Sequence, residues 1–164
     1  MAIMFRVRDF FKPRKAVLKE AGIKQGFCVL DYGCESGGYV TDASMMAGET
    51  GKIYAIDIHP LAIRMVENIA SKKQLANVKT ICSDCKTGLE NSSIDVVIFY
   101  DTFHNLEEPD RVLKELHRLL KPKGTLSFSD HHMSERDIVS KVTNSGLFRL
   151  LNKGEKTYSF AKKK

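Results

Sequence analysis

Carboxylates follow three separate apolar runs of this chain, at the points where strands should end. Asp31 precedes a loop with glycines at positions 33, 37 and 38, and Asp57 and Asp84 each follow a later run. In an open parallel sheet, ligands bind beyond the carboxyl ends of the strands, so these loops should line one cleft. A carboxylate can meet a cationic amine, and glycines leave backbone amides open to an anion. The arrangement predicts a binding site for a small ligand that carries both charges.

Each of these features also has a purely structural interpretation. The glycine loop could be an ordinary turn, Asp57 could cap the helix that begins at Pro60, and Asp84 could be a turn residue between Ser83 and Cys85. Taken together they favour a nucleoside site, because Asp57 could accept both hydroxyls of a ribose. Asp84 could accept a hydrogen bond from the exocyclic amine of an adenine.

The elements that position these residues alternate between apolar runs and helical patterns, which predicts an α/β protein. Strands are expected at residues 27–31, 52–57, 78–82, 94–100 and 125–129, and helices after Pro13, at 39–47, from Pro60, from Pro109 and at 135–144. Pro122 and Gly124 should end the fourth of these helices before the strand at 125–129. Two final runs, at 147–151 and 156–161, are separated by a short turn and predict an antiparallel hairpin.

Composition predicts one soluble domain over residues 1–164, in which residues 1–25 form an N-terminal arm and helix that could act as a lid. The chain is 43% hydrophobic and has no run as long as the roughly 18 apolar residues of a membrane span. No secretory signal is evident, so we expect a cytoplasmic protein with reduced thiols. Its net charge of +6 is concentrated at the two ends. Such ends could contact RNA, although Lys-rich termini are usually just solvated.

The motifs described above resemble those of class I S-adenosylmethionine-dependent methyltransferases. Residues 29–34, Val-Leu-Asp-Tyr-Gly-Cys, look like the first motif of that family, residues 54–57 like its acidic ribose position, and residues 94–97 like its fourth-strand motif. Residues 102–106 and 109–124 are similar to the branch that contains ubiquinone and menaquinone biosynthesis methyltransferases. The resemblance implies a Rossmann-like fold with a seven-stranded, mostly parallel sheet in the order 3-2-1-4-5-7-6 and a C-terminal antiparallel hairpin.

The resemblance and the strand ends together predict a set of residues that bind S-adenosylmethionine. They are Asp31, Tyr32, Gly33, Cys34, Gly37, Asp57, Ile58, Ser83, Asp84, Cys85 and Tyr100. Tyr100 is expected to form a wall of the methionine pocket rather than to act as an acid or base. A dinucleotide site is disfavoured, because residues 33–38 do not spell G-x-G-x-x-G.

One residue departs from the family pattern. The family usually has glycine where this chain has Glu35, in the loop that approaches the methionine part of the cofactor. Glutamate adds bulk and a negative charge near the carboxylate of the ligand, so we expect weakened cofactor binding. The hypothesis is that Glu35→Gly tightens it. A cofactor-binding protein with weak or no transferase activity is therefore an alternative function.

Candidate catalytic residues follow the fourth strand. His104 is the leading candidate for a general base, with Asp101 beside it, although His104 could instead be a packing residue at the start of a helix. His131 and His132 follow the fifth strand and could meet substrate, cap a helix or bind adventitious metal, and the sequence does not choose among these roles. We expect no dedicated metal site. Cys82 and Cys85 form a C-x-x-C pair without a second ligand pair, so Cys82 is expected to be a buried strand residue.

The methyl acceptor is expected to be a small molecule. Phe5, Phe10 and Phe11 stand among cationic residues in the N-terminal arm and could form a lid with an apolar inner face. The same mixture could bind RNA, which is the alternative acceptor class. The lysine-aspartate-lysine-glutamate set of RNA 2′-O-methyltransferases cannot be assembled here, because residues 101–104 read Asp-Thr-Phe-His. The oligomeric state is not predicted.

Overall fold

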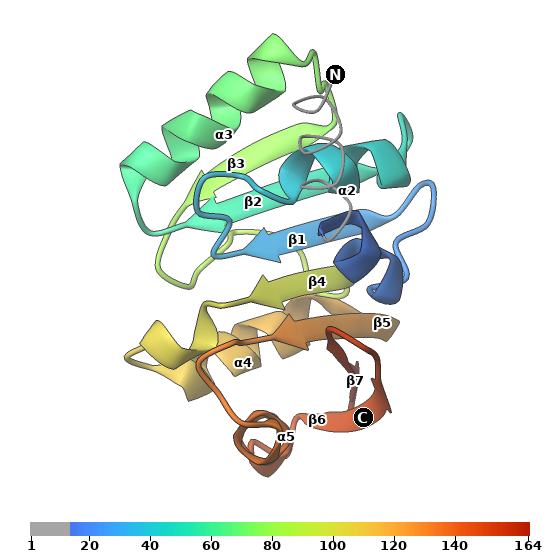
Figure 1. Cartoon of the computed structure of the whole chain (residues 1–164), viewed down its shortest axis with the longest axis vertical. Helices are drawn as coiled ribbons and strands as arrows, with labels where there is room; N and C mark the ends of the chain where they lie inside the picture. Colours follow the sequence, from blue (N-terminus) through green and yellow to red (C-terminus); the bar gives the residue numbers. More distant parts are fainter. Residues whose placement is uncertain (1–13) are drawn as a thin grey trace, which may run out of the picture.

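A computed structural model describes residues 14–164 of the chain. Its centre is a seven-stranded sheet with the strand order β3-β2-β1-β4-β5-β7-β6 (Figure 1). The strands are β1 (Cys28–Tyr32), β2 (Lys52–Asp57), β3 (Val78–Cys82), β4 (Ile94–Tyr100), β5 (Leu120–Ser129), β6 (Phe148–Lys153) and β7 (Tyr158–Lys162). Strands β1 to β5 run parallel, while β7 pairs antiparallel with β5 and β6. The predicted sheet order and the C-terminal hairpin are confirmed.

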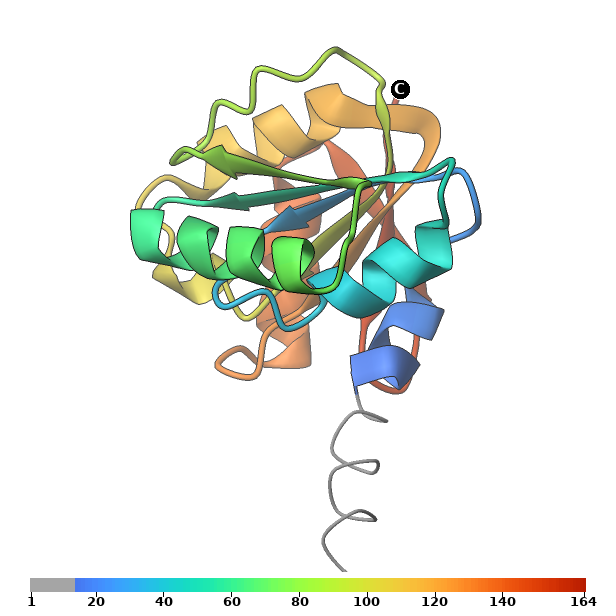
Figure 2. The same ribbon diagram turned by 90° about the horizontal axis from the view of Figure 1, so that it is seen from above.

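Helices cover both faces of the sheet. They are α2 (Val40–Ala47), α3 (Pro60–Lys72), α4 (Pro109–Leu119) and α5 (Glu135–Asn144), together with a short 3-10 helix η1 (Phe103–Asn105). Residues 14–20 are also helical. Figure 2 shows α2 and α3 on one face and α4 on the other. Proline begins α3 and α4 as predicted, because its fixed φ suits the first helical turn.

Alternate side chains of β4 enter two separate cores. Ile98 and Tyr100 pack on the face that α2 covers, whereas Val97 and Phe99 pack on the face that α4 covers. Successive side chains of a strand point to opposite faces, so a strand between two helical layers must be apolar throughout. This burial is the reason for the nearly unbroken apolar run of residues 94–100, and it fixes the position of the loop that follows.

Strand β5 begins earlier than predicted, at Leu120 rather than Thr125, and includes Pro122 and Gly124. Leu120 pairs with Ile94, and the regular pairing with β4 resumes at Thr125 after a shift in register. Pro122 lies within that irregular segment, where its missing N–H costs no ladder hydrogen bond. The prediction that helix α4 ends before these residues is confirmed.

The prediction that Cys82 is buried is wrong. Cys82 is exposed, although it does belong to strand β3. Strand β3 lies at the edge of the sheet, with β2 on one side only, and Cys82 is its last residue, which explains the exposure of its side chain. Cys34 and Cys85 are buried as expected for apolar surroundings.

The N-terminal helix is tied to the C-terminal hairpin by one carboxylate. Glu20 accepts hydrogen bonds from the backbone N–H groups of Glu155, Lys156 and Thr157 and from the Thr157 hydroxyl. Partial burial is the largest single influence on the pKa of Glu20 and acts to raise it, but these hydrogen bonds together lower that pKa.

Predictions that concern Phe5, Phe10 and Phe11 fall outside the described residues. Within residues 14–164, no helix has the length and apolar character needed to cross a membrane.

Candidate cofactor-binding and catalytic site

A cavity of about 430 Å³ lies beyond the carboxyl ends of β1, β2 and β3. Its volume falls within the range of about 300–1,000 Å³ that is usual for small-ligand sites. Seven of the predicted cofactor-binding residues line it: Tyr32, Gly33, Asp57, Ile58, Ser83, Asp84 and Cys85. Residues from three separate loops thus meet in one cavity, as the strand ends predicted.

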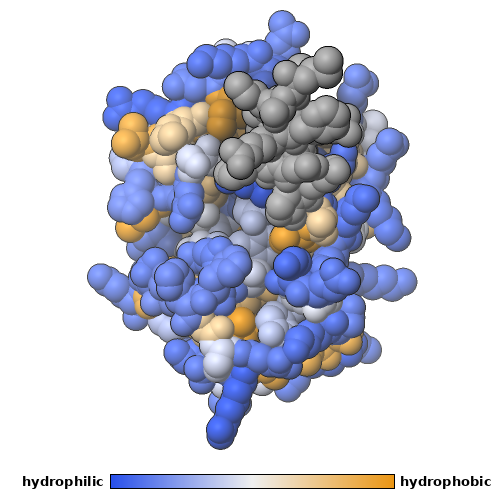
Figure 3. Space-filling model, in the orientation of Figure 1, coloured by the Kyte–Doolittle hydropathy of each residue, from blue (hydrophilic) through white to orange (hydrophobic). Residues whose placement is uncertain are grey.

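A second cavity, of about 170 Å³, lies beyond the ends of β1 and β4. Asp31, Gly33, Cys34 and Tyr100 line it, as does the catalytic candidate Asp101. Gly33 and Glu35 line both cavities, so the two spaces meet over the glycine loop. Gly37 lines neither, so any part that it plays in binding is indirect. Figure 3, viewed as in Figure 1, shows mainly hydrophilic residues on the side of the molecule that faces the viewer, with hydrophobic ones in small separate groups.

Asp57 links strand β2 to the glycine loop. Its side chain accepts hydrogen bonds from the backbone N–H groups of His59, at 2.9 Å, and Glu35, at 3.0 Å. Asp57 does not cap helix α3, whose N-cap residue is His59. With 8% of its surface exposed, it faces the larger cavity with lone pairs that two backbone donors do not exhaust.

The third strand-end carboxylate, Asp84, has a partner that the sequence did not indicate. Its carboxylate lies 3.4 Å from the guanidinium of Arg111, a residue of helix α4. The hydroxyl of Tyr32 donates to the backbone carbonyl of Asp84 at 2.6 Å and joins the loops after β1 and β3. Arg111 lines the same cavity, but its place inside a helical pattern gave no signal for a binding role.

Asp31 is the least satisfied polar group of the described residues. It is 3% exposed, and its Oδ2 is the only buried side-chain oxygen or nitrogen in residues 14–164 without a hydrogen-bond partner. Burial, reinforced by the negative charges of Asp57 and Glu35, raises the pKa of Asp31 to about 7. Such a group is suited to a cationic ligand, because a positive charge would supply the missing partner.

The glycine loop fits closely against its neighbours. Gly33 has φ of +75°, and a Cβ there would overlap the side chain of Thr102. Gly37 has φ of +79°, and a Cβ would lie 3.1 Å from Val66 of helix α3. Glu35 also has a left-handed backbone, with φ of +47°, which is unfavourable for a residue with a side chain. The position where the related family usually has glycine is therefore strained in this chain.

The two candidate catalytic residues occupy different places. Asp101 lines the smaller cavity and accepts hydrogen bonds from the backbone N–H and the ring of His131. His104 lines neither cavity, and its Nδ1 lies 2.9 Å from the buried carboxylate of Asp130. Each carboxylate thus holds a histidine from the neighbouring loop. The suggestion that His131 or His132 caps a helix is wrong, because the side chain of Ser134 caps α5.

Fold and site together define a class of protein. A parallel sheet in the order 3-2-1-4-5, an antiparallel hairpin at positions 7 and 6, and a glycine loop faced by an acidic residue after β2 are the features of a class I methyltransferase domain. Consistent with this, the model of a family described as "Methyltransferase domain" matches residues 23–162. The chain belongs to that family.

Individual relatives agree with this assignment. The Ubiquinone/menaquinone biosynthesis C-methyltransferase UbiE of Marinomonas sp. is 23% identical over 84% of this chain and 56% of its own length. The Demethylmenaquinone methyltransferase of Staphylococcus aureus is 32% identical over 68% of this chain and 46% of its own length. The chain thus spans about half the length of the curated relatives it matches.

A solved structure matches over most of both chains. A crystal structure of a SAM-dependent methyltransferase from Aquifex aeolicus superimposes with a TM-score of 0.82 at 29% identity, covering 90% of this chain and 89% of that one. The cofactor of this domain is S-adenosylmethionine, and the dinucleotide alternative is discarded. The unpartnered oxygen of Asp31 and the exposed lone pairs of Asp57 fit the amine and ribose of that cofactor.

Proposed function

We propose that this chain transfers a methyl group from S-adenosylmethionine to a small-molecule acceptor of the hydroquinone class. The observation that carries the proposal is the pair of cavities that share Gly33 and Glu35, with the unpartnered Asp31 in the smaller one and Asp57 in the larger one. This arrangement supports a ligand with a cationic amine at one end and a ribose toward the other. The class of acceptor is suggested by the names of the relatives, which refer to quinone biosynthesis and to demethylmenaquinone.

We assign the parts of the cofactor to the two cavities as follows. Asp57 would hold the ribose hydroxyls, and Asp84 would accept a hydrogen bond from the adenine amine, with Ile58 against the ring. In the smaller cavity, Asp31 would meet the amino group and Tyr100 would form a wall. Cys34, Tyr32, Ser83 and Cys85 complete the lining, and Gly33 and Gly37 shape the loop.

When bound, the cofactor supplies a methyl group on a sulfonium, so the protein needs little covalent machinery. Its residues must hold the acceptor in line, exclude water and accept a proton. Two Asp–His pairs are available to accept the proton, namely His104 with Asp130 and His131 with Asp101. A positioned base of this kind contributes about 10² to 10⁴-fold to the rate.

The test uses purified protein in two stages. Calorimetry should first show binding of S-adenosylmethionine, and mass spectrometry should find adenosyl sulfur compounds among any ligands released by the protein. Protein with methyl-labelled cofactor is then incubated with naphthohydroquinone and, separately, with total RNA. Label in the hydroquinone supports the proposal, whereas label only in RNA would replace the acceptor class. Binding without transfer to any acceptor would favour a cofactor-binding protein.

A further inference from the structure

The loops after β4 and β5 exchange carboxylates and histidines. Asp101, after β4, binds His131 from the loop after β5, and Asp130, after β5, binds His104 from the loop after β4. The exchange follows from the pairing of Tyr100 with Ser129, because the two strands end side by side. We propose that His131 is the catalytic base and Asp101 its positioning residue, an inference that rests on the proposed methyl transfer and deepens it.

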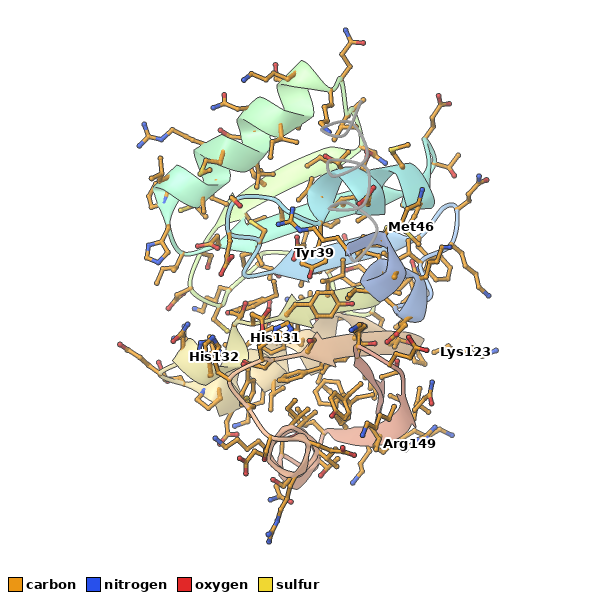
Figure 4. All side chains as sticks on the ribbon, viewed as in Figure 1. Tyr39, Met46, Lys123, His131, His132 and Arg149 are labelled. Carbon is orange, nitrogen blue, oxygen red and sulfur yellow. The ribbon has the colours of Figure 1, made fainter. Side chains whose placement is uncertain are left out.

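Location separates the two pairs. Neither histidine lines a cavity itself, but Asp101 lines the smaller cavity together with Asp31 and Tyr100, whereas Asp130 lines neither cavity. His131 is therefore held beside the space assigned to the methionine end of the cofactor. The His131 side chain is 80% exposed, compared with 22% for His104. Figure 4 shows His131 and His132 near each other, where strand β5 ends.

The hydrogen bonds of His131 fix its orientation. Its backbone N–H donates to Oδ1 of Asp101 at 2.7 Å, and its Nδ1 lies 2.8 and 2.9 Å from the two carboxylate oxygens. Both oxygens of an ionised carboxylate are acceptors, so Nδ1 must carry the hydrogen of the neutral ring. Nε2 then has the free lone pair and is the atom that can take a proton.

The backbone of Asp101 is strained in a way that keeps this carboxylate in place. Its φ is +50°, which is left-handed for a residue with a side chain, and its N–H donates to the Ser129 carbonyl at 2.8 Å. Residues held in such conformations cluster at functional sites, where the surrounding structure compensates for the cost. Asp101 also lines the smaller cavity and contacts Nδ1 of His131 through both carboxylate oxygens. Together with the strain, these observations favour a positioning role for Asp101.

The second pair has the features of a structural clasp. The Asp130 side chain is 0% exposed and also accepts the backbone N–H groups of His104, at 3.1 Å, and His132, at 3.0 Å. The rings of His104 and His132 lie 4.2 Å apart between centroids. These contacts hold the loops after β4 and β5 together, and they do not involve the largely exposed side chain of His131.

The proton balance is simple. An electron pair of the acceptor forms the new bond to the methyl carbon, and the electrons of the broken carbon–sulfur bond stay on sulfur. The acceptor loses one proton for each methyl group it gains. Nε2 of His131 takes that proton from the acceptor, and the imidazolium releases it to water because the side chain is exposed.

The variant that tests the inference is His131→Asn, because its side-chain amide can still donate to Asp101 but cannot accept a proton at the position of Nε2. We expect kcat for transfer to naphthohydroquinone to fall about 10² to 10⁴-fold, with the cofactor Kd unchanged within about twofold. His132→Asn is the matched control, and its kcat should stay within about threefold of the wild type. An unchanged kcat in His131→Asn, or an equal loss in His132→Asn, would overturn the inference.

A second measurement does not depend on turnover. Proton–nitrogen NMR of the histidine rings should show His131 as the Nδ1–H tautomer in the wild type and lose this preference in Asp101→Asn. A wild-type ring with its hydrogen on Nε2 overturns the role of His131 as base. If the wild type binds cofactor but does not methylate naphthohydroquinone, the acceptor class is wrong, and the NMR result still decides whether His131 has the tautomer that a base requires.

Discussion

The carboxylates differ between the side of the cleft that we assign to the cofactor and the side that we assign to the acceptor. On the cofactor side, Asp31 is buried with an unpartnered oxygen, and Asp57 meets only two backbone donors. On the acceptor side, Asp101 and Asp130 are each bound to a histidine ring and to backbone N–H groups. Asp31 and Asp57 thus leave negative charge for a ligand to satisfy, although Asp84 on the same side is paired with Arg111. Asp101 and Asp130 instead orient histidines of the protein itself.

The largest effect on binding is expected from Asp57. In Asp57→Ala the ribose hydroxyls lose a charged acceptor, and affinity for S-adenosylmethionine should fall about 30- to 100-fold by calorimetry. Asp57→Asn, which keeps one oxygen acceptor, should show a smaller loss. If the alanine variant binds the cofactor normally, the contrast between an open cofactor side and a closed acceptor side does not hold.

A loss of stability is expected from Asp130. Asp130→Ala removes a fully buried acceptor and leaves part-buried donors of His104 and His132 without it, so it should lower the free energy of unfolding by about 2 kcal/mol. Asp101 is more exposed, so Asp101→Ala should cost less.

The contribution of Asp130 to stability should also depend on pH. Although burial acts to raise the pKa of Asp130, the hydrogen bonds from His104 and His132 outweigh it and lower that pKa. The contribution is therefore present above the unfolded-state pKa and is lost on acidification through the lower folded-state value. Denaturant titrations over a pH series would measure both effects.

Asp31→Asn is expected to change stability and binding in opposite directions. The pKa of Asp31 rises from 3.8 to about 7 on folding, so its stabilising contribution is full below pH 3.8 and is lost as the pH rises through 7. Asparagine removes the cost of the buried charge, and Tm should rise more at about pH 8 than at about pH 5.

Cofactor binding provides the second half of that prediction. Wild-type affinity should weaken as the pH falls below 7, because protonated Asp31 no longer attracts a cationic amine. Asp31→Asn should bind about tenfold more weakly above that pH and show a flatter pH profile by calorimetry. A variant that gains neither stability nor pH independence would mean that Asp31 is not charged in the folded protein.

Glu35→Gly should give a moderate gain. Glycine removes the left-handed strain at φ of +47° and should raise the free energy of unfolding by about 1 kcal/mol. It also removes a negative charge from the edge of both cavities, so cofactor affinity should increase. Glu35→Ala is the control, since it removes the charge and keeps the strain. Equal or weaker affinity in the glycine variant would contradict the expectation.

The smallest effect is expected from Cys82→Ser. The Cys82 side chain is exposed at the end of an edge strand, so the free energy of unfolding should change by less than about 0.5 kcal/mol. Cys85→Ser, at a buried position beside the larger cavity, is the comparison and should cost more in the same chemical denaturation experiment. Equal costs would mean that the loops after β3 are less ordered than their contacts suggest.

The sequence by itself determined the order of the elements and three of the carboxylates that line the two cavities. Apolar alternation located the strands, and carboxylates at their ends identified Asp31, Asp57 and Asp84, because parallel strands deliver their carboxyl ends to one edge. The sequence did not predict the exposure of a side chain whose surroundings depend on neighbouring elements. Cys82 belongs to an apolar run, but only its place at the edge of the sheet leaves it exposed.

The pairing of carboxylates with histidines in the loops after β4 and β5 was decided by tertiary structure alone. His104 and Asp101 stand close in sequence and suggested one catalytic group, yet each is bound to a residue of the next loop. That exchange depends on the in-register ends of β4 and β5 at Tyr100 and Ser129. Residue type and spacing show which side chains lie at the end of a strand. The hydrogen-bond partner of each side chain depends on strand register, which arises only when the sheet assembles.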